Sequence, residues 1–172
     1  MKRIVLWGAL AFLAAAPLSA QRPWTFGVAG GLSVPTGRLD QSVNSGWHIA
    51  GSAALGSLMQ PLGVRAELSV HRLGFEAPVV GVQHWTTALT LNGTYRPPMT
   101  DSPWSPYLIA GLGLYHVRCT PGGSCNDNTG LGWNAGAGVK ANVMGLQAFL
   151  ETRYHAARGG PKFVPITVGV LF

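Results

Sequence analysis

The stretch Phe163-Val-Pro-Ile-Thr-Val-Gly-Val-Leu-Phe172 decides the fold of this chain. Every second residue from Val164 onward is apolar, and the last of them is the aromatic Phe172. A period of two places these side chains on one face of a β-strand, because successive side chains in a strand point to opposite sides. The stretch therefore predicts a strand with one wholly apolar face. The opposite face carries Pro165, Thr167, Gly169 and Leu171.

The first twenty residues have the layout of a secretory signal peptide. A basic start, Met1-Lys2-Arg3, precedes the apolar run Ile4–Ala16, and Pro17-Leu18-Ser19-Ala20 leads to a cleavage site before Gln21. The apolar run is shorter than the roughly 20 residues that a membrane-spanning helix needs. We therefore expect residues 1–20 to be removed on export and residues 21–172 to form one domain.

The composition is unusual for a soluble domain. Charged residues make up only 10% of the chain, and 24 residues are glycine. No run after residue 20 is long or apolar enough for a membrane helix, and low charge without such a helix is typical of a barrel whose outer face meets lipid. The net charge is +6, of which Lys2 and Arg3 contribute two, so the exported chain is only mildly basic. No stripe of Lys and Arg with interleaved aromatic residues indicates a nucleic-acid surface.

Seven further segments alternate in the same way as the last one. Each is near the roughly 9–11 residues that a tilted membrane strand requires. In Tyr107–Arg118 both faces are apolar, so the sequence leaves its orientation open. The eight segments are Trp24–Val34, Trp47–Leu55, Leu62–Arg72, His84–Arg96, Tyr107–Arg118, Leu131–Val143, Leu146–Ala156 and Phe163–Phe172.

The connections between these segments alternate in length. The first, third, fifth and seventh are long and rich in turn-forming residues: Pro35–Gly46, Leu73–Gly81, Cys119–Thr129 and Ala157–Lys162. Among the others, Met59-Gln60-Pro61 and Met144-Gly145 are short, while Pro97–Pro103 is longer. Membrane barrels place short turns at the periplasmic end and long loops outside. The sequence thus predicts an all-β, eight-stranded antiparallel up-and-down transmembrane β-barrel.

Aromatic residues gather near the ends of the predicted strands. In membrane barrels such residues form girdles where rings meet lipid head groups. A soluble lipocalin-like barrel is disfavoured, because the apolar outer faces would exceed the few hundred Å² of apolar patch that a soluble monomer tolerates. The expected girdle residues are Trp24, Trp47, Trp85, Tyr95, Trp104, Tyr107, Trp133, Tyr154, Phe163 and Phe172.

The order and spacing of four stretches resemble a known family. They are Thr25–Gly31, Ser105–Gly113, Glu151–Tyr154 and Val164–Phe172. The chain resembles the eight-stranded outer-membrane barrels of the outer membrane protein A and X type, the broad outer membrane protein beta-barrel domain family. The resemblance spans residues 21–172. It implies a bacterial outer-membrane location, contact with outer-membrane lipid, and recognition of the closing strand with Phe172 by the barrel-assembly machinery.

The predicted inward faces carry charged side chains. An eight-stranded barrel is just wide enough to be filled by its own side chains, and a buried charge without a partner is costly. We therefore expect an interior network of ion pairs that plugs the lumen, with a narrow ion pore as the alternative. A sealed lumen would give substrate no access for acid–base catalysis. The network residues are Arg65, Glu67, Lys140, Glu151 and Arg153, with His71 on the same faces.

The histidines give no sign of a metal site or of catalysis. Each of the five lies alone on its own segment, so no pair has the spacing of metal ligands. In length and strand count the chain is similar to lipid A 3-O-deacylases, which use a His-x-Ser motif near this position. Here Tyr154-His155-Ala156-Ala157-Arg158 lacks the serine. A lipid-modifying enzyme is therefore the second alternative, and we expect no catalytic residue and no cofactor.

Cys119 and Cys125 are the only cysteines, and they flank Pro121-Gly122-Gly123 in one predicted loop. In an exported chain a disulfide is favoured over metal binding. So small a ring stabilises the fold by roughly 2 kcal/mol. The bond would be a local staple, or it would stiffen the loop for recognition. The sequence therefore predicts a structural protein, or one that binds an extracellular ligand through its loops.

Overall fold

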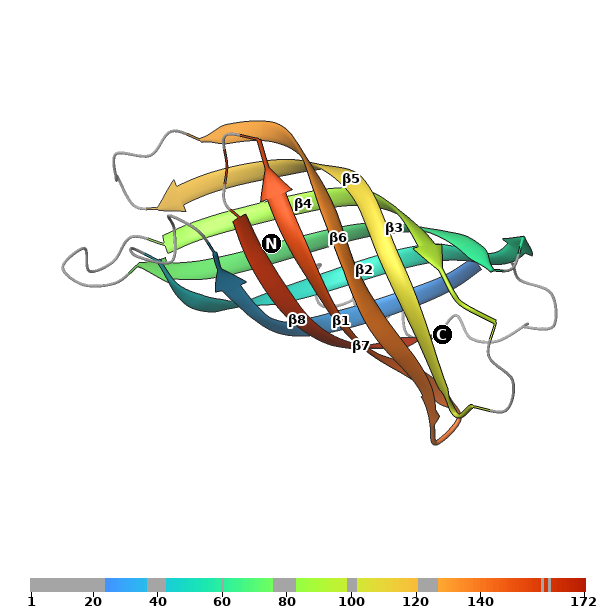
Figure 1. The fold of residues 1–172 in the computed structure, drawn as a ribbon. Coiled ribbons are helices and arrows are strands. Elements are labelled where there is room, and N and C mark those ends of the chain that lie inside the picture. The colour runs from blue at the N-terminus through green and yellow to red at the C-terminus, as the bar shows by residue number, and fades with distance from the viewer. Residues whose placement is uncertain are drawn as a thin grey trace, which may run out of the picture.

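The structure, a computed structural model, describes residues 24–36, 43–59, 61–75, 83–98, 102–120, 127–158, 160 and 162–172. In these residues the chain forms a closed barrel of eight antiparallel strands in sequence order (Figure 1). The predicted up-and-down barrel is confirmed. The described segments contain no helix that is long and apolar enough to cross a membrane. The strands are β1 Trp24–Pro35, β2 Val43–Met59, β3 Leu62–Phe75, β4 Gln83–Tyr95, β5 Trp104–Thr120, β6 Asn128–Val143, β7 Leu146–Ala157 and β8 Lys162–Leu171.

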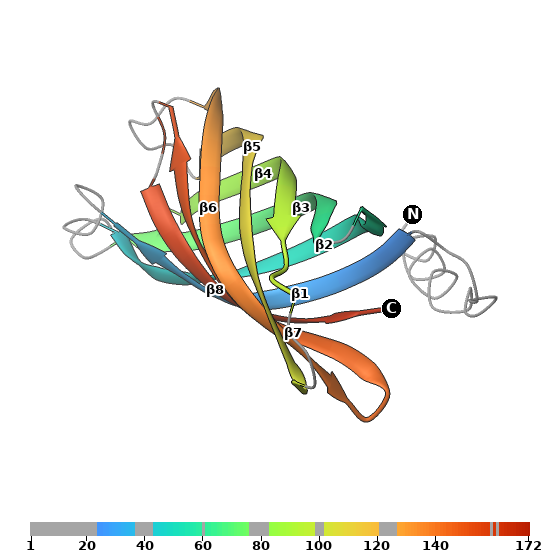
Figure 2. The same cartoon turned by 45° about the vertical axis from the view of Figure 1, so that its right-hand side comes forward.

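β8, the strand predicted from the last ten residues, closes the barrel against β1. The ladder runs from Gly27 opposite Leu171 to Pro35 opposite Phe163. Beyond it, Phe26 and Phe172 exchange two backbone hydrogen bonds of 2.9 Å. The start of β1 and the end of β8 therefore lie at the same end of the barrel (Figure 2).

Each strand contains the core of its predicted segment, and most extend further. The largest difference is β2, predicted over Trp47–Leu55 and observed over Val43–Met59. Its pairing with β3 shifts register twice, between Asn44 and Trp47 and between Gly56 and Met59. Each shift breaks the strict alternation from which the segment was predicted, because a bulge adds a residue on one strand only. The segment predicted from periodicity alone was therefore too short at both ends.

The two ends of the barrel differ in their connections. At the end that holds the start of β1, the connections are residues 60–61, 96–103 and 144–145; we call this the turn end. At the other, the loop end, they are 36–42, 76–82, 121–127 and 158–161, most of which lie outside the described residues. The β6–β7 turn has positive φ at both Met144 (51°) and Gly145 (83°). Two such residues suit the twist of a tight hairpin.

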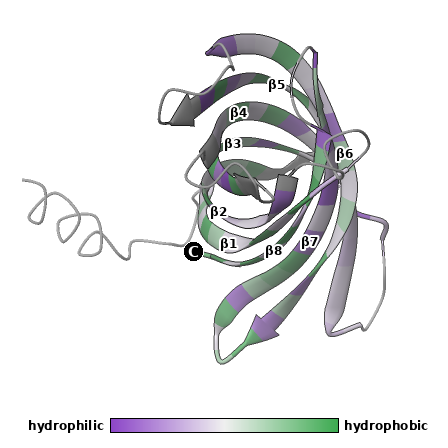
Figure 3. Cartoon of the chain, turned by 90° about the vertical axis from the view of Figure 1, so that its left-hand side faces the viewer, coloured by the Kyte–Doolittle hydropathy of each residue, from purple (hydrophilic) through white to green (hydrophobic). Residues whose placement is uncertain are grey.

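The outer face of the barrel is apolar and the inner face is mixed. Leu68, Leu91 and Leu112 are 54–68% exposed and point outward, while polar side chains fill the inner faces. Hydrophilic and hydrophobic residues accordingly alternate along the strands in Figure 3. In β5, whose orientation the sequence left open, Tyr107 points inward and Leu108 outward.

Two of the expected girdle residues belong to the interior instead. Tyr107 is only 3% exposed and Phe163 is fully buried, so neither ring meets lipid. The prediction for both was wrong because it relied on closeness to a strand end and not on the face that each residue occupies. Trp24, Trp104 and Phe172 are at least half exposed, as a girdle at the turn end requires.

Inward-facing aromatic rings lie over glycines of the next strand. Tyr107 on β5 is paired with Gly138 on β6, and a Cβ at Gly138 would lie 2.5 Å from the Tyr107 ring. Phe149 on β7 stands in the same relation to Gly169 on β8. Glycine is needed at these positions because the narrow lumen has room for the ring or for a second side chain, but not for both.

We expect Gly138→Ala to destabilise the barrel by roughly 1–3 kcal/mol, since the added methyl group must displace the Tyr107 ring. Gly51→Ala is the matched control. Gly51 is exposed on β2, and a Cβ there meets nothing within 4 Å. Reversible urea unfolding in detergent micelles measures both variants, and equal effects of the two substitutions would contradict this account.

Candidate functional site

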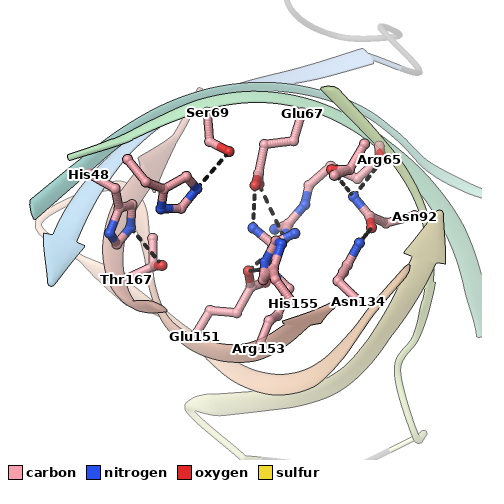
Figure 4. A network of polar contacts seen from close by, with 12 residues as sticks. His48, Arg65, Glu67, Ser69, Asn92, Asn134, Glu151, Arg153, His155 and Thr167 are labelled. Atoms are coloured by element: carbon pink, nitrogen blue, oxygen red, sulfur yellow. Dashed lines mark hydrogen bonds and ion pairs between the residues drawn. The ribbon is translucent and has the colours of Figure 1, made fainter. Parts of the chain in front are cut away.

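Four charged side chains from two strands meet inside the barrel. Arg65 and Glu67 come from β3, and Glu151 and Arg153 come from β7. These strands are four steps apart in either direction around the ring of eight, so they stand on opposite walls. The contacts between them therefore cross the lumen (Figure 4).

Each of the four charges has an opposite charge within ion-pair distance. Arg65 Nη2 donates to both oxygens of Glu151, at 2.7 and 2.6 Å, and lies 3.5 Å from Glu67. Arg153 lies 2.8 Å from Glu151 through Nε and donates to Glu67 through Nη2. All four side chains are at most 5% exposed. Two cations and two anions cancel, which is the condition for burying charges at this depth.

Uncharged groups extend the network to the other walls. The Tyr107 hydroxyl donates to Glu151 Oε2 at 2.6 Å. Asn92 on β4 donates to the backbone carbonyl of Arg65 at 3.3 Å, and Asn134 on β6 donates to Asn92 at 2.8 Å. Sequence reasoning missed these three residues. The inward alternation of Asn92 and Asn134 was visible, whereas the orientation of Tyr107 was left open. Nothing in a sequence states which walls face each other.

Lys140, the fifth residue predicted for the network, lies beside it. Its Nζ stands 5.4 Å from the centre of the Tyr107 ring, and within the described residues no carboxylate lies in ion-pair range of it. Lys140 is also less buried than the other four. It touches the network through Tyr107 and forms a cation–π contact.

Three histidines meet one layer closer to the loop end. His48 and His71 are direct partners between β2 and β3, with rings stacked 5.0 Å apart. His155 on β7 lies 6.0 Å from His71 and stacks on Phe163 at 5.0 Å. Although each histidine is alone on its strand, as the sequence shows, the closure of the barrel brings the three together.

Hydroxyl groups bind the histidine cluster. Ser33 Oγ lies 2.8 Å from His71 Nδ1, and Thr167 Oγ1 lies 3.0 Å from His48 Nε2. The Tyr115 hydroxyl lies 2.9 Å from His155 Nδ1. In the described part of the chain no three His, Cys, Asp or Glu side chains are arranged to hold a metal ion.

The predicted disulfide lies outside the described residues. Cys119 is the last residue but one of β5, but Cys125 falls in the undescribed segment 121–126. The disulfide between Cys119 and Cys125 therefore stays a prediction.

The closed eight-stranded ring, the apolar outer face and the polar interior are the marks of a small outer-membrane barrel. Comparison with protein families decides the point. Residues 6–170 match the family described as outer membrane protein beta-barrel domain. The chain belongs to this family. It is a small eight-stranded barrel of the bacterial outer membrane, as the resemblance implied.

Solved structures of the same architecture show how the outer-membrane barrel compares. Neisserial surface protein A (NspA) matches with a TM-score of 0.70 at 18% identity, over 89% of this chain and 98% of that one. The N-terminal barrel of Pseudomonas aeruginosa OprF has a TM-score of 0.57 at 16% identity, with coverages of 88% and 98%. Ail of Yersinia pestis has a TM-score of 0.50 at 15% identity, over 86% of this chain and 98% of that one. At identities this low, the structural similarity shows a shared fold and nothing further. No curated protein matches the chain significantly in sequence.

We expect Glu151→Gln to destabilise the outer-membrane barrel by roughly 3–5 kcal/mol, because it leaves two buried cations, Arg65 and Arg153, with Glu67 as their one remaining counter-ion. Asp127→Asn is the matched control. It removes the same charge from an exposed ion pair with Arg118, where the expected effect is about 0–1 kcal/mol.

Urea unfolding in micelles again provides the measurement. A Glu151→Gln barrel as stable as the Asp127→Asn barrel would show that the interior charges are solvated and that the lumen is open to water.

Proposed function

We propose that this protein is a closed-lumen barrel with a structural role in the outer membrane, and that its loops are the part that interacts with extracellular ligands. The observation that carries the proposal is the ion-pair network between β3 and β7. Its four side chains are nearly inaccessible to solvent and span the lumen from wall to wall. An eight-stranded barrel has no further width through which ions could pass such a plug.

The layers on either side of the network support a sealed interior. Toward the loop end, the rings of His71, His155 and Phe163 are in mutual contact and at most 1% exposed. Toward the turn end, Phe149 lies under the Arg65 guanidinium and is 4% exposed. Interaction is thereby left to the outer surface and to the loops, which in barrels of this kind are supported by a rigid scaffold.

A lipid-modifying enzyme is the weaker candidate. The one histidine that aligns with the deacylase position, His155, is fully buried, bonded to Tyr115 and stacked on Phe163. A lipid acyl chain on the outer wall cannot reach it. We infer that the protein is not an enzyme and needs no cofactor.

The sealed lumen predicts that the purified protein, inserted into planar lipid bilayers, gives no discrete conductance steps. Folding of the sample before it is added is verified by the changed migration of the unheated protein on a denaturing gel, relative to the boiled one. Reproducible steps whose size changes in Glu67→Gln would overturn the plug and favour the narrow pore. Glu67 is the suitable position, because it pairs with Arg153 at the centre of the network.

The assembly machinery and the surrounding lipid are the further partners that we propose. Phe172 is 66% exposed at the turn end of the closing strand, where a receptor for unfolded barrels can reach it. Residues 1–20 would direct the chain across the inner membrane beforehand, and the exported barrel would be residues 21–172.

Phe172→Ser is expected to lower the amount of assembled barrel in cells several-fold while leaving refolding in detergent unchanged. Phe26→Ser is the control, since Phe26 is the hydrogen-bonded neighbour of Phe172 and also faces outward, at 45% exposure. The readout is the heat-modifiable fraction in outer-membrane preparations. An equal loss in both variants would assign Phe172 a role in lipid contact alone.

A further inference from the structure

A row of aromatic and cationic side chains crosses the outer wall near the loop end. In the sheet register Trp47 on β2 is opposite Arg72 on β3, Arg72 is opposite Trp85 on β4, and Trp85 is opposite Arg118 on β5. All four occupy outward positions, so they form one continuous line on four neighbouring strands. We call this line the rim row.

Trp47, Arg72 and Trp85 of the rim row are in side-chain contact. The Trp47 and Trp85 rings meet edge to face at 5.9 Å, and the Arg72 guanidinium carbon lies 5.7 Å from the Trp85 ring centre. Arg118 forms a loose ion pair with Asp127 at 3.5 Å, and both side chains are more than half exposed. The Arg72 guanidinium is thus held against an aromatic ring, while the Arg118 guanidinium at the end of the row is exposed.

A surface pocket lies directly below the rim row. It has a volume of about 490 Å³ and is lined by Trp85, Thr87, His116 and Arg118. Thr87 and His116 are cross-strand partners, and His116 Nδ1 lies 2.8 Å from Thr129 Oγ1 on β6. That bond engages one ring nitrogen and leaves Nε2 as the one that can meet a ligand. The pocket therefore combines a guanidinium, an imidazole and a hydroxyl, which are all donors to phosphate oxygens.

The wall becomes wholly apolar one step further from the rim. Leu68, Leu89, Leu114 and Leu131 are also in register on four consecutive strands and are 50–67% exposed. Trp85 and Leu89 are four residues apart on one strand, which corresponds to roughly 13 Å. A head-group site and an acyl-chain surface thus follow one another along the membrane normal.

We propose that this wall binds a phosphorylated glycolipid of the outer leaflet. The phosphate would contact Arg118 and His116 in the pocket, and Arg72, which lies against the Trp85 ring, would supply a second guanidinium at the rim. The acyl chains would cover the leucines below. The loop end faces the cell exterior in this architecture, so the rim row stands at the outer head-group level. Arg on a lipid-facing wall is tolerated near the interface, and its planar fork matches a phosphate.

The position of the pocket selects a lipid over a free anion. It lies on the outer wall above the leucine belt, where acyl chains are already in contact with the protein. A free phosphate would forfeit that apolar contact. The proposal requires only the outer-membrane location and is independent of whether the lumen is closed.

The test is native mass spectrometry of the detergent-refolded barrel with bisphosphorylated lipid A. Arg72→Gln/Arg118→Gln should weaken binding at least tenfold. The matched control is Arg158→Gln/Lys162→Gln, which removes the same two charges from exposed positions at the same end, on the β7–β8 side. It should change binding by less than about twofold, since a dispersed positive charge gives only a weak, screened attraction.

Three results would overturn the proposal. Equal losses in the two double variants would show attraction by net charge alone. Unchanged binding in Arg72→Gln/Arg118→Gln would place the lipid elsewhere. Equal competition by inorganic phosphate would show an anion site without a lipid component. Each variant is first checked for heat-modifiable migration, so that a loss of binding is not a loss of folding.

Asp127→Asn should change lipid A binding in the opposite direction. It releases Arg118 from its ion pair and should strengthen lipid A binding by about two- to threefold. His116→Ala should weaken it. A gain in Asp127→Asn together with a loss in Arg72→Gln/Arg118→Gln cannot come from misfolding.

Discussion

The structure depends on one constraint: no backbone amide in the lipid-facing wall can be left without a partner. A sheet satisfies this only when its first and last strands pair, and here β1 and β8 do so along nine residue pairs. Because every neighbouring pair, including β1 with β8, is antiparallel, the ring has an even number of strands, and the start of β1 and the end of β8 lie on one side. Ring closure also fixes which face of every strand is inside. Residue types alternate along the sequence because the inner and outer faces differ in this way.

Closure with eight strands leaves a narrow interior, and the inner face is adapted to that width. Large rings are placed where the adjacent strand supplies a glycine, as with Tyr107 and Gly138. The four charges of the ion-pair network form a balanced set, and the histidines are bound by hydroxyl groups. The interior is therefore a layered polar core, with aromatic residues at the turn end, ion pairs above them and imidazoles toward the loops. The outer wall carries the distinct chemistry expected of a surface in lipid.

The sequence was sufficient for most of what depends on neighbours along one strand. It predicted the strand count, the approximate bounds, the outward leucines and the inward position of Arg65, Glu67, Glu151 and Arg153. It could not predict contacts between opposite walls, since periodicity carries no information about which strands face each other. The meeting of His48, His71 and His155 is such a contact. Tyr107 and Phe163 were misplaced for a related reason: an aromatic residue near a strand end suits a girdle and a lumen equally well.

The arrangement of the interior charges also limits the order in which the barrel can form. The cross-lumen partners are 86 positions apart, and β7 is the last strand but one to be made. Until β7 arrives, Arg65 and Glu67 on β3 have only each other, at 3.5 Å, and a half-built sheet would expose both to the hydrocarbon interior. A partly inserted sheet is therefore not a stable resting state for this chain. Its strands must stay in contact with water, or with an assembling partner, until the complete ring can enter the membrane as a unit.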